Sequence, residues 1–311
     1  MQMSKTLLHT LVHRPSIPIA SITAATYLLS CSMSSASATT PSQTYNAVPY
    51  KSRHTTWPYR PSDFERSDPT PDDSFYSAPR FVTHIDDAAI ASLTRYYDAA
   101  LPRKGRILDF CSSWISHYPS SIASAAETKD LSIVGMGMNQ KELAANKVLN
   151  AGRILQDLNE DPVVPLTVCG EAAASGMPHS QDEEQGKLDA STCVVSIDYL
   201  IHPVEVLESL KERTKQGGKV HLIISNRCFP TKAVGRWLRV SEQERLAMVG
   251  DYLWFAGWRN IEILDLKAGE DQDEGPPKEQ GGLANFMKAM GMQLGGGKDP
   301  LWCVRATKGG D

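Results

Sequence analysis

The chain has 311 residues, of which 41% are hydrophobic and 22% charged, the composition of a globular protein with room for one large domain and extensions. A net charge of −4 gives no sign of nucleic-acid binding, which usually shows as a basic face or stripe. The six cysteines have no CxxC spacing, so we expect reduced, buried cysteines and neither a disulfide framework nor a zinc site.

The first forty residues differ in composition from the rest of the chain. Residues 1–40 contain no Asp or Glu, and basic residues lie among Ser, Thr and small apolar residues. This composition is typical of a transit peptide, and we expect a disordered leader that directs the protein to mitochondria. Plastid import is an alternative, as is a cytoplasmic form that starts at Met33. A secretory signal is less favoured; its apolar core would be residues 17–29, which are too few to span a bilayer.

An N-terminal extension is expected to follow the leader. Residues 41–79 are rich in Pro, Ser, Thr and aromatic residues and show no helical or strand period, so we expect them to lie extended over the domain. Apolar side chains then recur at helical spacing from Ile85 to Leu101, where Pro102 ends the pattern. Residues 41–100 are therefore predicted to be an extension and a helix that pack on the domain.

Residues 101–311 show strands that alternate with helices, which predicts an α/β domain with a mainly parallel sheet covered by helices on both faces. Strands are expected at residues 106–110, 131–136, 152–157, 190–198, 219–225, 260–266 and 301–307. Helices are expected at residues 118–129, 141–149, 204–214 and 236–254, with a turn at residues 215–218. Residues 267–299 are charged and Gly-rich at both ends, which predicts a partly disordered insertion.

The stretch from Gly105 to His117 is expected to organise the site. A short apolar strand ends at Asp109, and a loop of small residues, Cys111 to Ser113, begins just after it. In doubly wound α/β folds the binding crevice lies outside the carboxyl ends of the strands. We therefore expect the functional site at Asp109 to Ser113, with residues 133–139 as its partner.

Other chemistries find little support in the motifs. Residues 135–140 contain two glycines of a dinucleotide fingerprint, but Gln140 stands in place of the third, and the run follows the second strand instead of the first. GxSxG, P-loop and HExxH motifs are absent from the sequence, and its eight histidines show no metal-ligand spacing.

The order and spacing of four segments resemble a known family. RILDF, IVGMGMN, QDLNED and SIDYLIHPVEVLESLKERTKQGGKVHLIIS look like successive motifs of the class I S-adenosylmethionine-dependent methyltransferases, of the methyltransferase type 11 kind. SNRCFPTKAVGRWL looks like a mark of an uncharacterised eukaryotic subgroup. The resemblance covers about Ala100 to Lys308. It implies a Rossmann-like, doubly wound, mostly parallel sheet of seven strands with an antiparallel last strand, and S-adenosylmethionine as cofactor.

The resemblance also implies which residues bind the cofactor. The matching positions are Asp109, Phe110, Cys111, Ser112, Ser113, Gly137, Met138, Asn139, Asp157, Leu158 and Ser196. Two departures from the family pattern stand out. Cys111 to Ser113 occupy the place of a glycine-rich loop, and Gly137 occupies the place of the acidic residue that holds the ribose, with Asn139 two residues on as an alternative acceptor.

The implied reaction is methyl transfer to an unidentified small-molecule acceptor, in which alignment and exclusion of water provide most of the acceleration. Asp198, Tyr199 and His202 follow the fourth strand and are candidates for a base or for orienting the acceptor, although His202 equally suits a simple helix start. Arg227 follows the fifth strand and either holds an acidic substrate or pairs with a carboxylate. The alternative function is a catalytically degenerate fold that acts as a binding or assembly protein.

Overall fold

The structure is a computed structural model that describes residues 45–170, 186–267 and 299–309. The chain divides into two units at residue 41, and all described residues belong to the second unit. The predicted leader and most of the predicted insertion at residues 267–299 therefore lie outside the described residues. In the described part of the chain, no helix is long and apolar enough to cross a membrane.

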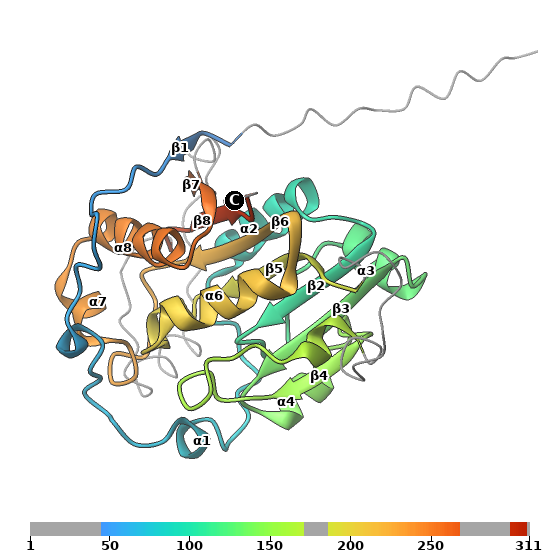
Figure 1. Ribbon diagram of the computed structural model, residues 1–311. Coiled ribbons are helices and arrows are strands. Elements are labelled where there is room, and N and C mark those ends of the chain that lie inside the picture. Colours follow the sequence, from blue (N-terminus) through green and yellow to red (C-terminus); the bar gives the residue numbers. More distant parts are fainter. Residues whose placement is uncertain (1–44, 171–185, 268–298, 310–311) are drawn as a thin grey trace, which may run out of the picture. The chain divides into compact units, whose positions relative to one another are not determined.

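The core of the domain is a mixed sheet with the strand order β1-β7-β8-β6-β5-β2-β3-β4 (Figure 1). Its strands are β1 (Ala47–Pro49), β2 (Gly105–Phe110), β3 (Leu131–Gly137), β4 (Gly152–Leu155), β5 (Leu188–Val194), β6 (Thr214–Ile224), β7 (Arg259–Asp265) and β8 (Trp302–Thr307). Neighbours from β4 to β6 pair in parallel, whereas β8 is antiparallel to both β6 and β7. The predicted Rossmann-like sheet with an antiparallel last strand is confirmed.

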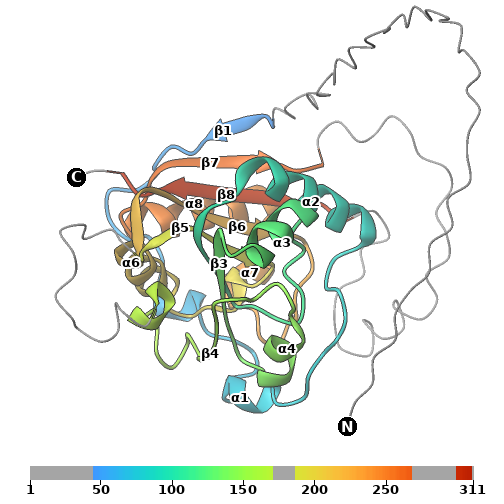
Figure 2. The same cartoon turned by 90° about the vertical axis from the view of Figure 1, so that its right-hand side faces the viewer.

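Helices cover both faces of the sheet (Figure 2). They are α1 (Asp72–Phe75), α2 (Asp87–Ala100), α3 (Ser120–Glu127), α4 (Gln140–Ala145), α6 (Pro203–Arg213), α7 (Gly235–Arg239) and α8 (Glu242–Phe255). Successive strand residues point to opposite faces, so Ile107 of β2 packs in one apolar cluster with α2 and α3, and Leu108 packs in another with α6 and α8. A sheet buried on both faces explains why its central strands are near-continuous apolar runs.

Several elements differ from the sequence prediction: the helix expected at residues 141–149 ends at Ala145, and the strand expected at residues 152–157 ends at Leu155. The helix expected at residues 236–254 is two helices, because the Ser241 side chain accepts from the backbone N–H of Glu244 and starts α8. The turn expected at residues 215–218 lies inside β6, where the register against β5 is irregular and Gly217 has a φ of +76°. The strand expected to reach Asp198 ends at Val194, and residues Ile197–Tyr199 form a short 3-10 helix instead.

The extension that precedes α2 contributes an eighth strand and is tied to the domain by a buried carboxylate. β1 pairs with the edge strand β7, which the prediction of seven strands missed. Further along, Tyr50, Arg53 and Tyr59 all hydrogen-bond to Asp251 of α8, whose side chain is fully buried, with Arg53 Nη2 2.7 Å from Oδ2. The chain then runs past α7 to α1 (Figure 1).

Candidate functional site

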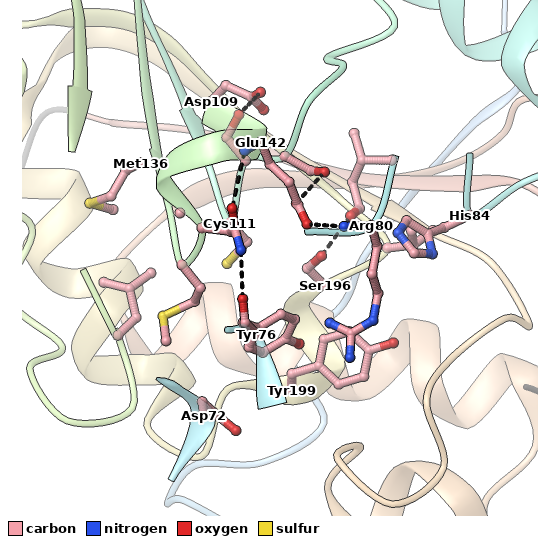
Figure 3. A pocket seen from close by; sticks show the side chains of 18 of the residues that line it. Asp72, Tyr76, Arg80, His84, Asp109, Cys111, Met136, Glu142, Ser196 and Tyr199 are labelled. Atoms are coloured by element: carbon pink, nitrogen blue, oxygen red, sulfur yellow. Dashed lines mark hydrogen bonds between the residues drawn. The ribbon is translucent and has the colours of Figure 1, made fainter. Parts of the chain in front are cut away.

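A cavity lies at the carboxyl ends of the parallel strands, where the strand order reverses between β2 and β5. The empty space at this place is about 1300 Å³, a value that includes open solvent at the mouth of the cavity. Most of the predicted site residues line it: Asp109, Cys111, Ser112, Ser113, Gly137, Met138, Asn139, Asp157, Leu158, Ser196, Tyr199 and Arg227. The fold thus brings the loops after β2, β3, β4, β5 and β6 to one place. Figure 3 shows part of this site, with Cys111 after β2 and Ser196 after β5.

Asp109 at the end of β2 organises the first loop. Its carboxylate accepts hydrogen bonds from Ser112 Oγ and Ser116 Oγ at 2.7 Å and from Thr192 Oγ1 at 3.1 Å. Burial raises the pKa of this carboxyl, and the three hydroxyl donors act in the opposite direction. A carboxylate engaged in this way holds the loop after β2 in one shape, so Asp109 supports the cavity wall.

The first loop lies unusually close to the end of β3. Cys111 has a φ of +53°, a left-handed conformation that glycine adopts without strain, and the backbone N–H of Ser112 donates to Met136 O at 2.8 Å. A Cβ at position 137 would overlap the carbonyl oxygen of Ser112. Gly137 is therefore required by this packing, and a ribose-binding carboxylate does not fit at that position.

Asn139 connects β3 to α4 and to the extension. Its side-chain oxygen accepts from the backbone N–H of Lys141 and Glu142 at 2.9 and 3.1 Å, which caps α4. Its Nδ2 donates to the backbone oxygens of Tyr76 and Ser77. A ribose contact by Asn139 would need a further lone pair of this oxygen or the loss of the cap.

Glu142, in the first turn of α4, is a lining residue that the sequence analysis missed. Its carboxylate accepts from the backbone N–H of Arg80 at 2.6 Å and from Ser113 Oγ at 2.7 Å. A signal was present in the sequence, since Asn139 followed three residues later by Glu is a helix-start pattern. Glu142 joins the loop after β2, the start of α4 and the extension at one point of the cavity.

Asp157 and Asn159 follow β4. Asp157 Oδ1 accepts from the backbone N–H of Asn159 at 2.9 Å, and burial is the main cause that raises the pKa of Asp157. The Asn159 amide donates to Asp72 Oδ2 at 2.8 Å and to Tyr199 O at 3.0 Å. Asn159 therefore joins this loop to the extension and to the loop after β5.

Residues 61–86, which we call the strap, form one side of the cavity. Six of its residues line the cavity: Asp72, Tyr76, Arg80, Val82, His84 and Ile85. Asp72 fastens the strap through an ion pair with the fully buried Lys232 at 3.3 Å, and a second ion pair, with Arg66 at 2.7 Å, lies within the strap. The indole of Trp114 donates to Val82 O at 2.9 Å. The sequence suggested a draped segment but gave no sign that it contributes to the site.

The part of the cavity next to β5 and β6 is aromatic. The rings of Tyr199 and Phe229 lie 6.1 Å apart, and the Tyr199 hydroxyl accepts from the backbone N–H of Phe229 at 2.9 Å. His84 and His117 line the same region. Burial lowers the pKa of each imidazole to about 4, so both rings are neutral near pH 7.

Three predicted site residues do not line the cavity. Phe110 packs in the core beneath it, and His202 is exposed at the start of α6. The 3-10 turn after β5 puts Tyr199 in the cavity wall and Asp198 in the interior, where burial raises its pKa to about 7. Asp198 differs from the prediction because β5 ends earlier than expected, which changes the direction of the side chains after it. Phe110 differs because it is the last residue of β2 and its side chain belongs to the apolar core cluster.

Arg227 lines the cavity, but its charge is already balanced. Its Nε lies 2.5 Å from Oδ2 of Asp299, whose side chain is 1% exposed. Of the two roles that the sequence left open for Arg227, pairing with a carboxylate is the one that the structure shows. No group of His, Cys, Asp and Glu residues suited to a metal ion occurs among the described residues.

Comparisons with known proteins find similarity of fold only. No family model matches the chain, and no curated protein matches it. One similar solved structure is phosphoethanolamine N-methyltransferase 2 of Haemonchus contortus in complex with S-adenosyl-L-methionine, at 14% identity and a TM-score of 0.40, over 71% of this chain and 52% of that chain. The chain thus spans about half the length of that enzyme.

One bacterial and one archaeal structure show similarly low sequence identity and TM-scores. A possible histamine N-methyltransferase of Thermotoga maritima has 14% identity and a TM-score of 0.39, over 71% of this chain and 90% of that chain. An S-adenosylmethionine-dependent methyltransferase of Archaeoglobus fulgidus has 12% identity and a TM-score of 0.40, over 71% of this chain and 94% of that chain. At such identities and scores the likeness concerns the sheet architecture, and no residue role follows from it.

Proposed function

We propose that this chain is a class I, type 11-like S-adenosylmethionine-dependent methyltransferase that acts on a small-molecule acceptor. The observation that carries the proposal is the meeting of three predicted cofactor loops, after β2, β3 and β4, at one cavity beside the point where strand order reverses. The strap closes the acceptor side of the same cavity. The alternative is a catalytically degenerate fold that acts as a binding or assembly protein, which the replacement of loop glycines by Cys111 to Ser113 favours.

The residues of the cavity fit such a cofactor in two of three regions. Asp157 and Leu158 offer an acceptor and an apolar surface for the adenine, and the loop from Cys111 to Ser113 offers small side chains for the methionine part. At the ribose, Gly137 leaves no side chain, so Glu142 is the candidate acceptor. A carboxylate has about four lone-pair sites, and two protein donors on Glu142 leave some unused.

The bound cofactor supplies an electrophilic methyl group on a sulfonium, and the protein must align an acceptor with it and exclude water. The strap and the rings of Tyr199 and Phe229 provide the water-excluding wall on the acceptor side. His84 and His117 are neutral near pH 7, so each imidazole has a lone pair for an acceptor proton. Neither Asp198 nor His202 reaches the cavity, so neither is proposed as a base.

Calorimetric titration of S-adenosylhomocysteine into the full chain tests the proposal. We expect binding by the wild-type protein and, in Asp157→Ala, a binding free energy weaker by about 1.5–3 kcal/mol, the range for a lost hydrogen bond to a charged group. Glu160→Ala is the matched control, because Glu160 is exposed on the same loop, and it should bind as the wild type does. Absence of binding by folded wild-type protein would favour the degenerate fold. Unchanged affinity in Asp157→Ala would place the adenine elsewhere.

A further inference from the structure

Two arginines line the cavity, and they differ in what balances their charge. Arg227 is paired with the buried carboxylate of Asp299. Arg80, by contrast, has no ion pair with a carboxylate in the described ranges of the chain. Its guanidinium lies on the ring of Phe75, with Cζ 4.4 Å from the ring centroid, and its Nη2 donates to Phe75 O at 2.8 Å. Among the described residues, the Arg80 guanidinium thus contacts aromatic rings and one carbonyl oxygen and is not neutralised by a carboxylate.

Arg80 also has a polar atom without a partner. Its Nη1 is buried and makes no hydrogen bond. An unsatisfied buried donor costs about 1–3 kcal/mol, and more when the group is charged. At the wall of a cavity, a water molecule or an acceptor group of a ligand can supply the missing hydrogen bond.

The acidic residues around the cavity are engaged by other groups. Asp72 is paired with Arg66 and Lys232, and Asp109 accepts from three hydroxyls. Glu142 accepts from the backbone N–H of Arg80 and from Ser113, and not from the Arg80 guanidinium. The positive charge of Arg80 thus remains available on the acceptor side, and it is one of the causes that lower the pKa of the neighbouring His84.

The surroundings of Arg80 specify the rest of the ligand. The guanidinium Cζ lies 5.7 Å from the ring centroid of Tyr76 and 5.6 Å from that of Phe229, and Tyr199 continues this aromatic surface (Figure 3). A flat apolar group packs favourably on such rings. The strap residue Arg80 thus brings a cation to an aromatic pocket beside the predicted cofactor loops.

We propose that Arg80 is the counter-ion of an anionic group, a carboxylate or a phosphate, on the methyl acceptor, whose flat apolar part lies among Tyr76, Tyr199 and Phe229. The guanidinium fork suits either anion, because it donates two parallel hydrogen bonds to carboxylate or phosphate oxygens. That the ligand is a methyl acceptor rests on the proposed function. The binding of an anion at Arg80 can be measured without any cofactor.

Fluorine NMR titrations with 4-fluorobenzoate, 4-fluorophenyl phosphate and the neutral 4-fluorobenzamide test the assignment on the full chain. We expect the wild-type protein to bind at least one anion about tenfold more tightly than the amide, and Arg80→Met to lose this preference. Arg80→Lys should keep part of it, because charge remains and the fork is lost. Arg239→Met is the control: Arg239 is exposed and does not line the cavity, so the preference should be unchanged. The two anions distinguish a carboxylate from a phosphate site.

Equal affinity for anions and amide, no binding of any probe at millimolar concentration, or full anion preference in folded Arg80→Met would each overturn the assignment. Competition by inorganic phosphate in the wild-type protein gives a readout that does not depend on the folding of a variant. We expect it to displace the anions more readily than the amide. Calorimetry with S-adenosylhomocysteine on the same samples reports separately on the proposed function. If anion binding at Arg80 fails, cofactor binding can still be measured, and the reverse also holds.

Discussion

The two sides of the cavity differ in how completely their polar groups are paired. On the loop side, Asp109, Asn139 and Glu142 each accept two or more hydrogen bonds from protein groups. On the strap, Arg80 Nη1 and His84 Nδ1 are buried without partners. Nδ1 of His117, which follows β2 and is close enough to His84 to lower its pKa, is also buried without a partner. The difference indicates that the loop side is preorganised by the protein itself, whereas the strap side leaves hydrogen-bonding capacity for a ligand.

The strongest test of this comparison removes the centre of the loop-side network. Asp109→Ala leaves the hydroxyls of Ser112, Ser116 and Thr192 without their carboxylate, and we expect a loss of about 3 kcal/mol in the free energy of unfolding, measured in urea. Asp98→Ala is the control, because the Asp98 side chain is 54% exposed and should cost less than about 1 kcal/mol. Equal losses in the two variants would show that Asp109 does not organise the loop.

A second variant loosens the strap. Asp72→Ala removes an acceptor shared by Arg66, Lys232 and Asn159, and it leaves the buried Lys232 with Asp68 and Thr70 as partners. We expect a loss of about 2 kcal/mol in stability and faster hydrogen exchange of the strap amides. Asp73→Ala changes the next residue, which is exposed, and should leave exchange unchanged. Strap amides that exchange no faster in Asp72→Ala than in Asp73→Ala would show that the strap is fastened elsewhere.

The third test uses pH. Because the pKa of His117 is lowered to about 4 from an ordinary 6.5, the unfolded state binds more protons between these values, and His117 destabilises the fold as the pH falls through this window. Replacing it in His117→Gln should flatten the pH dependence of unfolding by up to about 1.4 kcal/mol per pH unit. Asp198, with a pKa raised to about 7, acts in the opposite direction, so variant and wild type are compared at each pH.

The exposed His202 provides the matched control for the pH test. His202→Gln should show the pH dependence of the wild-type protein, because that ring contacts water before and after unfolding. A wild-type slope in His117→Gln as well would mean that the His117 ring is charged, or open to water, in the native state.

The sequence predicted the parts of the fold and site that depend on local pattern. Strands β2 and β3 and the second half of β6 contain apolar runs, and the loops after β2 and β3 follow from where those runs end. The division between α7 and α8 also had a local signal, Ser241 followed three residues later by Glu244, which was missed.

What the sequence could not predict depends on contacts between distant residues. Strand β1 has three residues and no strand pattern of its own, and it forms only because β7 offers an unpaired edge. No sequence motif marks Arg80 or His84 as a site residue. They reach the cavity because Asp72, in the same strap, is paired with Lys232, far along the chain. Asp198 and Tyr199 are adjacent in sequence, and only the 3-10 turn after β5 decides which of them lines the cavity.

The pairing of β1 with β7 has a consequence for the order of folding during synthesis. Ala47 lies opposite Leu264, so β1 waits for more than two hundred residues before its partner leaves the ribosome. Closing so long a loop is slow relative to the local pairing of β2 with β3. The parallel strands β2 to β5 and their loops are synthesised before β7, so they can assemble before β1 takes its place in the sheet. Until β1 pairs, β7 keeps one unpaired edge, and an unpaired strand edge is a place where newly made chains can aggregate.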